Sequence, residues 1–506
     1  MSSGRGGRRT AEPSATRRWA ALGVLLLPVL LVSVDNTVLA FALPQISLSL
    51  APGATQVLWM VDIYPLVLAG LLVPMGALAD RYGRRRMLFI GSVGFALVSV
   101  AAAFAPTGEA LVAARAGLGV FGAMLMPSTL SLLRSIFTDR AQRRTAIAIW
   151  AAGFASGSAL GPIVGGFLLA HFWWGSVFLM AVPVLVLFLV LAPFLLPESR
   201  DPDGHPLDPW SAVLVLVAML ALVFGIKTAA KGGALGLGLA ALAVGLVVIV
   251  VFVRRQLRLA HPMIDVRLFA TGAFSGAVLV NLLSVFSLIG FLFFVSQQLQ
   301  LVHGYAPMDA GLALLPGVLA MIVAGLSVVP IVQRVRPVVV VCGALLASGA
   351  GYATIALGDG TVGVTTIMVS FALLAAGVGA AETVSNDLIV SAVPEARAGA
   401  ASAISETAYE VGTVLGTAIL GTILTNAYSD RVVLPDGLTA AQAATARDTL
   451  AGATQVATEL PARNAEALLA SAHHAFGSGV ATTSLLGVVL SGVAVLLAAR
   501  TLRHAR

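Results

Sequence analysis

Acidic side chains lie inside several long runs of apolar residues, where a charge is costly. Six residues share this setting: Asp35, Asp62, Glu382, Asp387, Glu406 and Glu410. An isolated charge inside a bilayer costs several kcal/mol, so such residues are candidates for function. Arg115 is the one basic residue that we expect among them, and one cation cannot neutralise six acids. Several carboxyl groups must therefore be protonated, lie in a water-filled cavity or bind a cationic ligand. A carboxyl group that alternates between a proton and a cation exchanges one for the other.

Glu406 and Glu410 are four residues apart, so they share one face of a helix. Two acids on one face are unsuited to lipid contact, which favours a hydrated interior face with Tyr409 beside it. The alternative is that either glutamate serves only as a structural hydrogen-bond acceptor.

Asp62 has an aromatic setting, between Trp59 and Tyr64. A carboxylate beside aromatic rings suits an organic cation, which is attracted by the charge and by the ring faces. The alternative is a hydrated acid beside aromatic residues at the membrane interface. Asp35 is open to a similar alternative, and Asp387 could instead lie in water close to the inner surface.

Metal and cofactor chemistry has little support in the residues. The chain has a single cysteine, Cys342, and 7 histidines that include no ligand-spaced set. Loop acids cluster only at Asp201, Asp203 and Asp208, in a Pro-rich segment that makes a poor Mg²⁺ site for a lipid-linked transferase. We therefore expect no metal, no cofactor and no enzymatic activity.

Small residues repeat every four positions in one apolar run, at Gly153, Gly157, Gly161 and Gly165. This spacing places them along one helix stripe and allows close contact with another backbone. Pro162 removes a helix hydrogen bond and permits a bend. The stripe is open to two interpretations, a static packing seam or a pliable interface that is used when access switches sides.

A short charged turn contains Gly76, Asp80, Arg81, Gly83 and Arg84. Asp80 can pair with Arg84 or with a neighbouring helix end, and such a latch would favour one conformer. A loop that only sets membrane topology would explain the arginines, but not the combination of Asp80 with Gly83.

The elements that position these residues must be membrane helices. Of 506 residues, 58% are hydrophobic and 10% are charged, with a mean hydropathy of +0.97. Soluble domains are about 25% charged, so a soluble enzyme and a nucleic-acid-binding protein are both excluded. A bilayer crossing needs about 20 apolar residues. Continuous rather than alternating runs favour helices. Fourteen such runs are present: 19–42, 57–78, 87–104, 111–133, 145–170, 176–196, 210–227, 234–253, 274–299, 310–332, 337–356, 364–390, 399–424 and 478–498.

The basic residues test this count. With Met1 inside and fourteen spans, the Lys and Arg residues that fall outside are Lys227, Lys231, Arg431, Arg447 and Arg463. Nearly all of the other basic residues fall on the inner side, as expected for cytoplasmic loops. The net charge of +7 therefore reflects the basic residues of the cytoplasmic loops. The same distribution predicts that both termini lie in the cytoplasm.

The chain divides into two bundles of six spans, separated by two inserted spans. Parallel six-helix halves with a site between them are a transporter design. The segments are a disordered cytoplasmic tail (1–18), a first bundle (19–196), a cytoplasmic linker (197–209), the inserted helices (210–253), a second bundle (254–498) and a cytoplasmic tail (499–506). The second bundle includes an outer loop, 425–477, with amphipathic stretches at 439–457 and 462–475. These stretches predict an extracellular helical hairpin, and a tolerated insertion is the alternative.

Five of the motifs described above together resemble those of a known family. The stretch from Gly76 to Arg86 resembles the loop signature of the major facilitator superfamily, and Gly153 to Gly166 resembles the antiporter motif of its fifth span. Asp35 to Thr37, Arg115 and the stretch from Ser405 to Glu410 resemble motifs of its fourteen-span drug:proton antiporters of the QacA type.

The resemblance implies an all-α membrane protein of the major facilitator fold. It also implies a plasma-membrane protein that exports lipophilic, mainly cationic drugs and biocides in exchange for protons, by alternating access. We expect the protein to be a monomer. Asp35, Asp62 and one or both of Glu406 and Glu410 would then bind substrate or proton. The alternative is an exporter of a single antibiotic or metabolite, and span 310–332 lacks an acid that some members of the family carry there.

Overall fold

The computed structural model describes residues 14–200, 208–229, 234–260, 262–358, 362–392 and 398–503. Within these ranges the chain is helical and has no strand. Thirteen of the described helices are long and apolar enough to cross a membrane, and α5 adds a shorter apolar stretch, Leu160–His171. The all-helical membrane architecture is therefore as the sequence predicts.

The helices fall into three groups along the chain. The first half contains α1 (Ala15–Leu50), α2 (Ala54–Tyr82), α3 (Arg84–Ala103), α4 (Gly108–Ile136), α5 (Arg140–His171), α6 (Ser176–Leu179) and α7 (Ala181–Leu195). The α8–α9 insert consists of α8 (Pro209–Ala229) and α9 (Leu235–Arg258). The second half contains η1 (Val266–Ala270), α10 (Gly272–Gln297), η2 (Gln298–Val302), α11 (Pro307–Val332), α12 (Pro337–Ala356), α13 (Val364–Ser391), α14 (Ala398–Gly416), η4 (Thr417–Gly421), α15 (Thr422–Arg431), α16 (Ala440–Asp448), α17 (Leu450–Ala457) and α18 (Ala462–Thr501).

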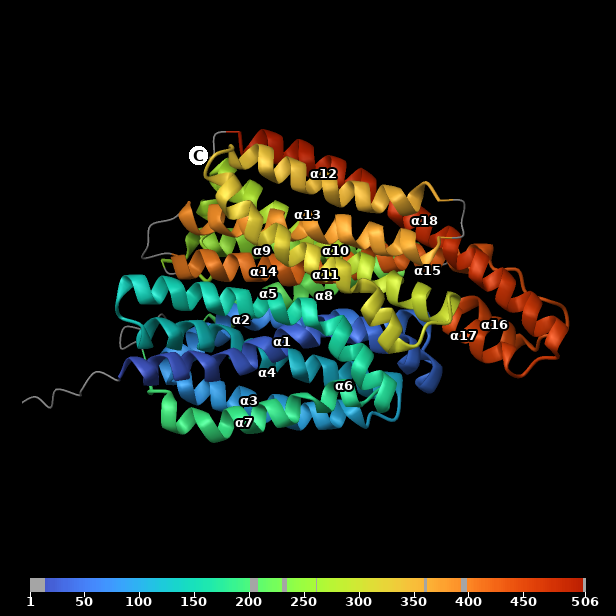
Figure 1. The fold of residues 1–506 in the computed structure, drawn as a ribbon, viewed down its shortest axis with the longest axis horizontal. Coiled ribbons are helices and arrows are strands. Elements are labelled where there is room, and N and C mark those ends of the chain that lie inside the picture. The colour runs from blue at the N-terminus through green and yellow to red at the C-terminus, as the bar shows by residue number, and fades with distance from the viewer. Residues whose placement is uncertain are drawn as a thin grey trace, which may run out of the picture.

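Figure 1 shows the long helices side by side along the long axis of the molecule, with the first half below the second. In the first half α1 packs on α5 and α2 on α4; in the second, α11 packs on α13 and α12 on α18. We call the end where α1 begins and α18 ends the terminal face, and the end that carries α16 and α17 the hairpin face (Figure 1). Large apolar side chains such as Phe194 and Leu326 are exposed on the flanks, as expected for contact with lipid.

The first helix begins earlier than the sequence predicts. Residues 1–13 lie outside the described part, but α1 starts at Ala15, so residues 15–18 are helical rather than part of a disordered tail. Ser14 accounts for this difference, because its hydroxyl accepts a hydrogen bond from the backbone N–H of Arg17 at 3.4 Å. A serine N-cap satisfies one of the free N–H groups of a helix start.

The outer loop also differs in detail from the expected hairpin. α16 and α17 cover the first amphipathic stretch with a break at Thr449, whereas the second stretch is continuous with the last span in the 40-residue α18. Asp448 at the break accepts a hydrogen bond from the backbone N–H of Ala54, the first residue of α2, at 2.7 Å. The loop helices therefore pack on the first half as well as on the second.

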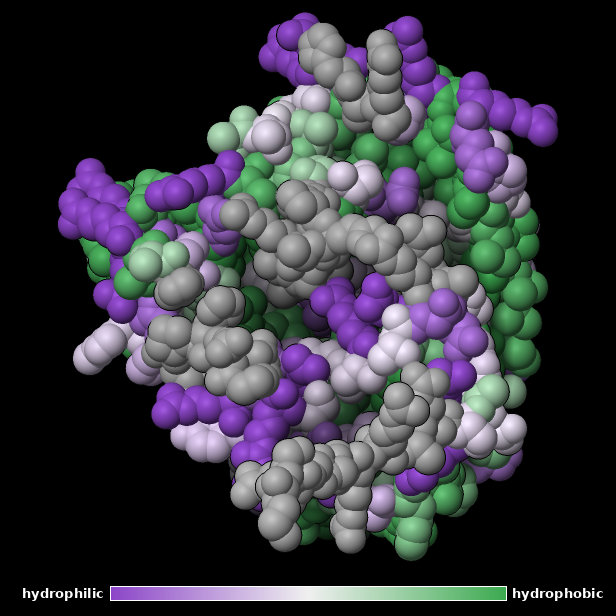
Figure 2. Space-filling view, turned by 90° about the vertical axis from the view of Figure 1, so that its left-hand side faces the viewer, coloured by the Kyte–Doolittle hydropathy of each residue, from purple (hydrophilic) through white to green (hydrophobic). Residues whose placement is uncertain are grey.

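The two halves meet close to the hairpin face. α5 crosses α11 there at small residues: a Cβ added to Gly166 would lie 2.8 Å from the Pro307 carbonyl oxygen, and one on Gly311 would lie 2.6 Å from that of Pro162. Only glycine permits so close an approach of two backbones. At the opposite end, Figure 2 shows the terminal face hollowed near its centre, with hydrophilic residues around the hollow.

Candidate transport site

A buried ion pair joins two helices of the first half. Arg115 of α4 donates from Nη1 to Oδ2 of Asp35 in α1 over 2.7 Å, and both side chains are at most 5% exposed. Arg115 also donates from Nε to the Met60 carbonyl oxygen of α2 at 3.2 Å. Its guanidinium lies 4.5 Å from the ring centre of Tyr64. The structure thus brings together Asp35, Arg115 and Tyr64, three of the residues that the sequence singles out.

Glu410 extends this cluster to the second half. Its Oε1 accepts a hydrogen bond of 3.4 Å from Nδ2 of Asn36, the residue that follows Asp35. Its Oε2 is buried and accepts no hydrogen bond from the described residues. Glu410 is therefore a buried carboxyl group with one neutral donor and no ion-pair partner in the described part of the chain.

An aromatic contact crosses between the halves beside Glu410. The rings of Tyr409 and Phe154 meet edge to face with their centres 5.5 Å apart. Phe154 stacks in turn with Trp150, whose indole N–H donates to the Thr129 hydroxyl at 3.1 Å. Tyr409 therefore links α14 to α5 and, through Trp150, to α4.

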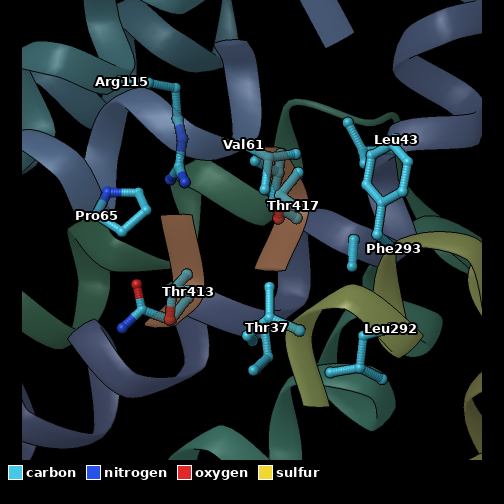
Figure 3. A pocket seen from close by; sticks show the side chains of 13 residues that line it. Thr37, Leu43, Val61, Pro65, Arg115, Leu292, Phe293, Thr413 and Thr417 are labelled. Carbon is cyan, nitrogen blue, oxygen red and sulfur yellow. The ribbon is translucent and has the colours of Figure 1, made fainter. Parts of the chain in front are cut away.

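A pocket lies between the two halves at this level. Figure 3 shows that it is lined by Arg115 on one side, by the hydroxyls of Thr413 and Thr417, and by the apolar side chains of Leu292 and Phe293. Asn36 also contributes to the lining. Its free volume is about 20 Å³, room for about one water molecule in this conformer, and Asp35 and Glu410 are not among the described residues that line it. We refer to it as the central pocket.

Glu406 lies one helical turn before Glu410, towards the terminal face. It interacts electrostatically with Arg134, near the end of α4. The two glutamates of α14 have different surroundings. Arg134 acts on Glu406, whereas Glu410 contacts the Asn36 amide and feels the charge of Arg115, which is itself paired with Asp35.

Lys227 is a residue that the sequence analysis assigned wrongly. We expected it outside the membrane, but its side chain is 3% exposed, and its Nζ lies 2.8 Å from Oδ2 of Asp62. The ammonium also lies 4.2 Å from the ring centre of Trp59. The expected span 210–227 ends at Lys227, and its charge was therefore counted on the outer side. The helix α8 continues to Ala229, so Lys227 lies inside the helix and not at its end.

Asp62 is consequently turned towards the α8–α9 insert. Asp62 is not among the described residues that line the central pocket. Its neighbour Val61 does line the pocket, and so does Thr417. Trp59 and Asp62 do meet a cation, as their types suggested, but this cation belongs to the protein itself.

The other two acids of α13 lie apart from the central cluster. Glu382 is partly buried, and its Oε1 accepts no hydrogen bond from the described residues. Asp387 is exposed near the end of α13 on the terminal face. Neither occurs among the described residues around the central pocket, and the described part of the chain holds no cluster of metal-ligating side chains.

The charged turn between α2 and α3 is a compact structure. Arg84 donates from Nε to Oδ1 of Asp80 at 2.8 Å, so the acid pairs within its own turn. Gly83 has φ +113°, and a Cβ there would lie 2.7 Å from the Glu198 carboxylate. Arg84 and Arg85 donate to the segment after α7, through Ser199 and Glu198. Gly76 packs on α4, where a Cβ would meet Pro127 at 3.3 Å, and Arg81 is exposed.

The glycine stripe of α5 faces α1. A Cβ on Gly153 would lie 2.7 Å from Leu26, and one on Gly157 would lie 2.8 Å from Ser33. A Cβ on Gly161 would overlap the Thr37 hydroxyl, and one on Gly165 would contact Val38 at 3.0 Å. The stripe is therefore a close backbone contact inside the first half, and Pro162 follows it at the crossing with α11.

Comparison with known proteins identifies the family. The sequence model of the Major Facilitator Superfamily matches residues 25–417. The chain belongs to this superfamily. It is a multi-pass membrane transporter and not an enzyme.

Two relatives and one solved structure are especially similar. The chain is 54% identical over 484 residues to "Multidrug efflux pump LfrA" of Mycolicibacterium smegmatis, covering 96% of each chain. It is 37% identical over 461 residues to "Methyl viologen resistance protein SmvA" of Salmonella typhimurium, covering 91% of this chain and 93% of the relative. A bacterial homolog of the human lysosomal transporter Spinster, solved inward-facing and unoccupied, is 17% identical with a TM-score of 0.66. The match covers 98% of this chain and 99% of that chain. The last comparison shows the shared fold.

Proposed function

We propose that this transporter is a proton-coupled antiporter that exports lipophilic, mainly cationic drugs and biocides by alternating access. In this proposal α5 also crosses the membrane, which brings the thirteen helices to fourteen spans, and the chain belongs to the QacA-type subfamily. The terminal face lies in the cytoplasm, because Arg81, Arg84, Arg85 and Arg134 gather at that end and cytoplasmic loops are rich in such residues.

The observation that carries the proposal is that Glu410 is buried and has no ion-pair partner among the described residues. Asp35 and Asp62 have buried cationic partners, whereas Glu410 has a single amide donor among the described residues. An ionised carboxylate without a partner is very unstable in a low-dielectric interior, so it must be protonated or bind a cation. A cationic drug that enters next to Glu410 therefore displaces a proton, which is antiport with one proton for each positive charge.

The surroundings of Glu410 couple this exchange to access. Asn36 and Phe154 of the first half contact Glu410 and Tyr409 of the second. A ligand at Glu410 therefore changes contacts between the two halves, and those contacts govern how the halves rock against each other. The closed crossing of α5 with α11 and the hollow terminal face correspond to a conformer that receives substrate from the cytoplasm.

The relatives support the class of substrate. A protein named a multidrug efflux pump is 54% identical, and one named for resistance to methyl viologen, an organic dication, is 37% identical. The apolar wall formed by Leu292 and Phe293 suits the hydrocarbon part of such cations.

The test is ethidium efflux in everted membrane vesicles that contain the wild-type protein. We expect the vesicles to accumulate ethidium when their interior is acidic, and to lose it when nigericin collapses the pH gradient. Accumulation that is insensitive to nigericin would contradict proton coupling. A panel of organic cations and antibiotics tests breadth, because movement of one compound only would favour the single-substrate exporter.

A further inference from the structure

The buried pair between Lys227 and Asp62 takes no part in the proposed exchange at Glu410. Asp62 is fully buried, and Lys227 is 3% exposed. Among the described residues, Lys227 is the charged group that interacts electrostatically with Asp62, and Asp62 is the one that interacts with Lys227. The pair joins the α8–α9 insert to α2 in the first half.

The pair lies beside a junction of all three parts of the molecule. Leu66 of α2, Val223 of α8 and Ala418 of η4 form one small buried cluster, with Trp59 and Met219 packed against it. α8 also presses closely on α2, since a Cβ on Gly70 would collide with Leu216. The insert is therefore in contact with the moving interface between the halves, although most of α9 faces outwards with exposed apolar side chains.

The pair is also incompletely satisfied. Nζ and Oδ2 approach to 2.8 Å, and the Thr417 hydroxyl of η4 also interacts with Asp62, yet Lys227 and both oxygens of Asp62 make no well-aligned hydrogen bond with described residues. A buried ion pair gains little net stability unless further hydrogen bonds compensate for lost hydration. The lysine ammonium is a compact charge on a flexible four-carbon chain, and Lys227 is two residues from the end of α8. This geometry favours exchange of partners over a rigid structural link.

We propose that Lys227 is a tethered cation that occupies Asp62 at rest, so that a proton or a cationic substrate reaches Asp62 only by displacing it. The α8–α9 insert then takes part in transport and is not a passive addition to the two halves. Displacement frees the end of α8 from α2, next to the contact between α2 and η4. This inference rests on the proposed function, because it assumes that cationic substrates are the molecules that compete.

The test compares ethidium binding by wild type, K227Q, K227R and D62N/K227Q in lipid nanodiscs at pH 8, where free protons compete little. Fluorescence anisotropy of ethidium gives Kd. K227Q removes the competitor and should bind ethidium about tenfold more tightly, which is about 1.4 kcal/mol. K227R should bind it at least about twofold more weakly, because arginine forms a stronger, bidentate pair with a carboxylate. The double variant lacks both charges and should lose the gain seen in K227Q.

R255Q is the matched control. Arg255 and Asp208 form another ion pair of the same insert, 2.9 Å long, at the opposite end of α8. Its removal should leave the ethidium Kd unchanged.

Equal ethidium Kd values for wild type and K227Q would overturn the proposal. If K227Q does not fold, K227R decides, because unchanged or tighter binding by this variant would also overturn it. Proton-driven transport by the wild type is scored separately in the same lipids. Its absence contradicts the proposed function, whereas tighter binding by K227Q supports the role of Lys227 in either case.

Discussion

Replacing Glu410 by glutamine removes one charge and little else. The glutamine carbonyl oxygen can still accept the hydrogen bond from Asn36, and at 3.4 Å that bond is long. Loss of such a weak contact changes the free energy of unfolding by less than about 1 kcal/mol. A bound organic cation, in contrast, loses its ionic partner, and interactions with a charged group are worth about 1.5–3 kcal/mol. We therefore expect Kd for ethidium to rise about 10- to 150-fold in E410Q.

Two assays check this prediction. Anisotropy at pH 8 gives the ethidium Kd in nanodiscs, and everted vesicles give the rate of proton-driven accumulation, which should fall to the background of empty vesicles. E466Q is the matched control, since Glu466 is exposed in the part of α18 that precedes the membrane. Equal Kd and equal accumulation for E410Q and wild type would refute the assignment of proton and cation exchange to Glu410.

Three further substitutions test the structural elements around the site. D35N leaves the Arg115 guanidinium buried without its acid, which should destabilise the protein by about 3–5 kcal/mol in thermal melts followed by fluorescence. D35N/R115Q should recover most of this stability. A double variant as unstable as D35N would contradict a stabilising role of the pair. G161V places a branched side chain against Thr37, so ethidium efflux should be lost even where the protein reaches the membrane, whereas normal efflux would show that the contact of α5 with α1 is dispensable. G83A places a Cβ on a residue with φ +113° beside Glu198, which should lower the free energy of unfolding by about 1–3 kcal/mol in the same thermal melts. An unchanged melting temperature would contradict this strain.

Much of the fold follows from hydropathy alone, because a bilayer demands about 20 apolar residues for each span. Fourteen runs were expected, and thirteen described helices meet the criteria for length and composition, with α5 described in part. The helix α1 begins four residues before the expected apolar run, because a serine cap at position 14 extends the helix beyond its apolar part. The break at Thr449 does not follow from hydropathy, because it is set by a cap: the Thr449 hydroxyl accepts a hydrogen bond from the backbone N–H of Gly452 at 2.9 Å and starts a new helix.

The site was harder to predict than the fold. Residue type marked Asp35, Arg115, Tyr64 and Glu410, since charge in an apolar run is conspicuous. Which acid pairs with which base depends on helix packing across the chain, and Lys227 is separated from Asp62 by more than half of the first bundle. The expected run 210–227 contains Lys227 as its last residue, so its charge was counted with the outer loop, whereas α8 continues two residues further and the side chain is buried.

The most direct test of the central claim is the number of protons released when ethidium binds. Purified wild-type protein in weakly buffered nanodiscs is mixed with ethidium near neutral pH, and a pH indicator dye records the protons that appear. Exchange at Glu410 predicts release of up to about one proton for each ethidium bound, and no release by E410Q at ethidium concentrations that saturate it. Saturating binding to the wild type without proton release would contradict the claim that a buried carboxyl group trades a proton for a cation.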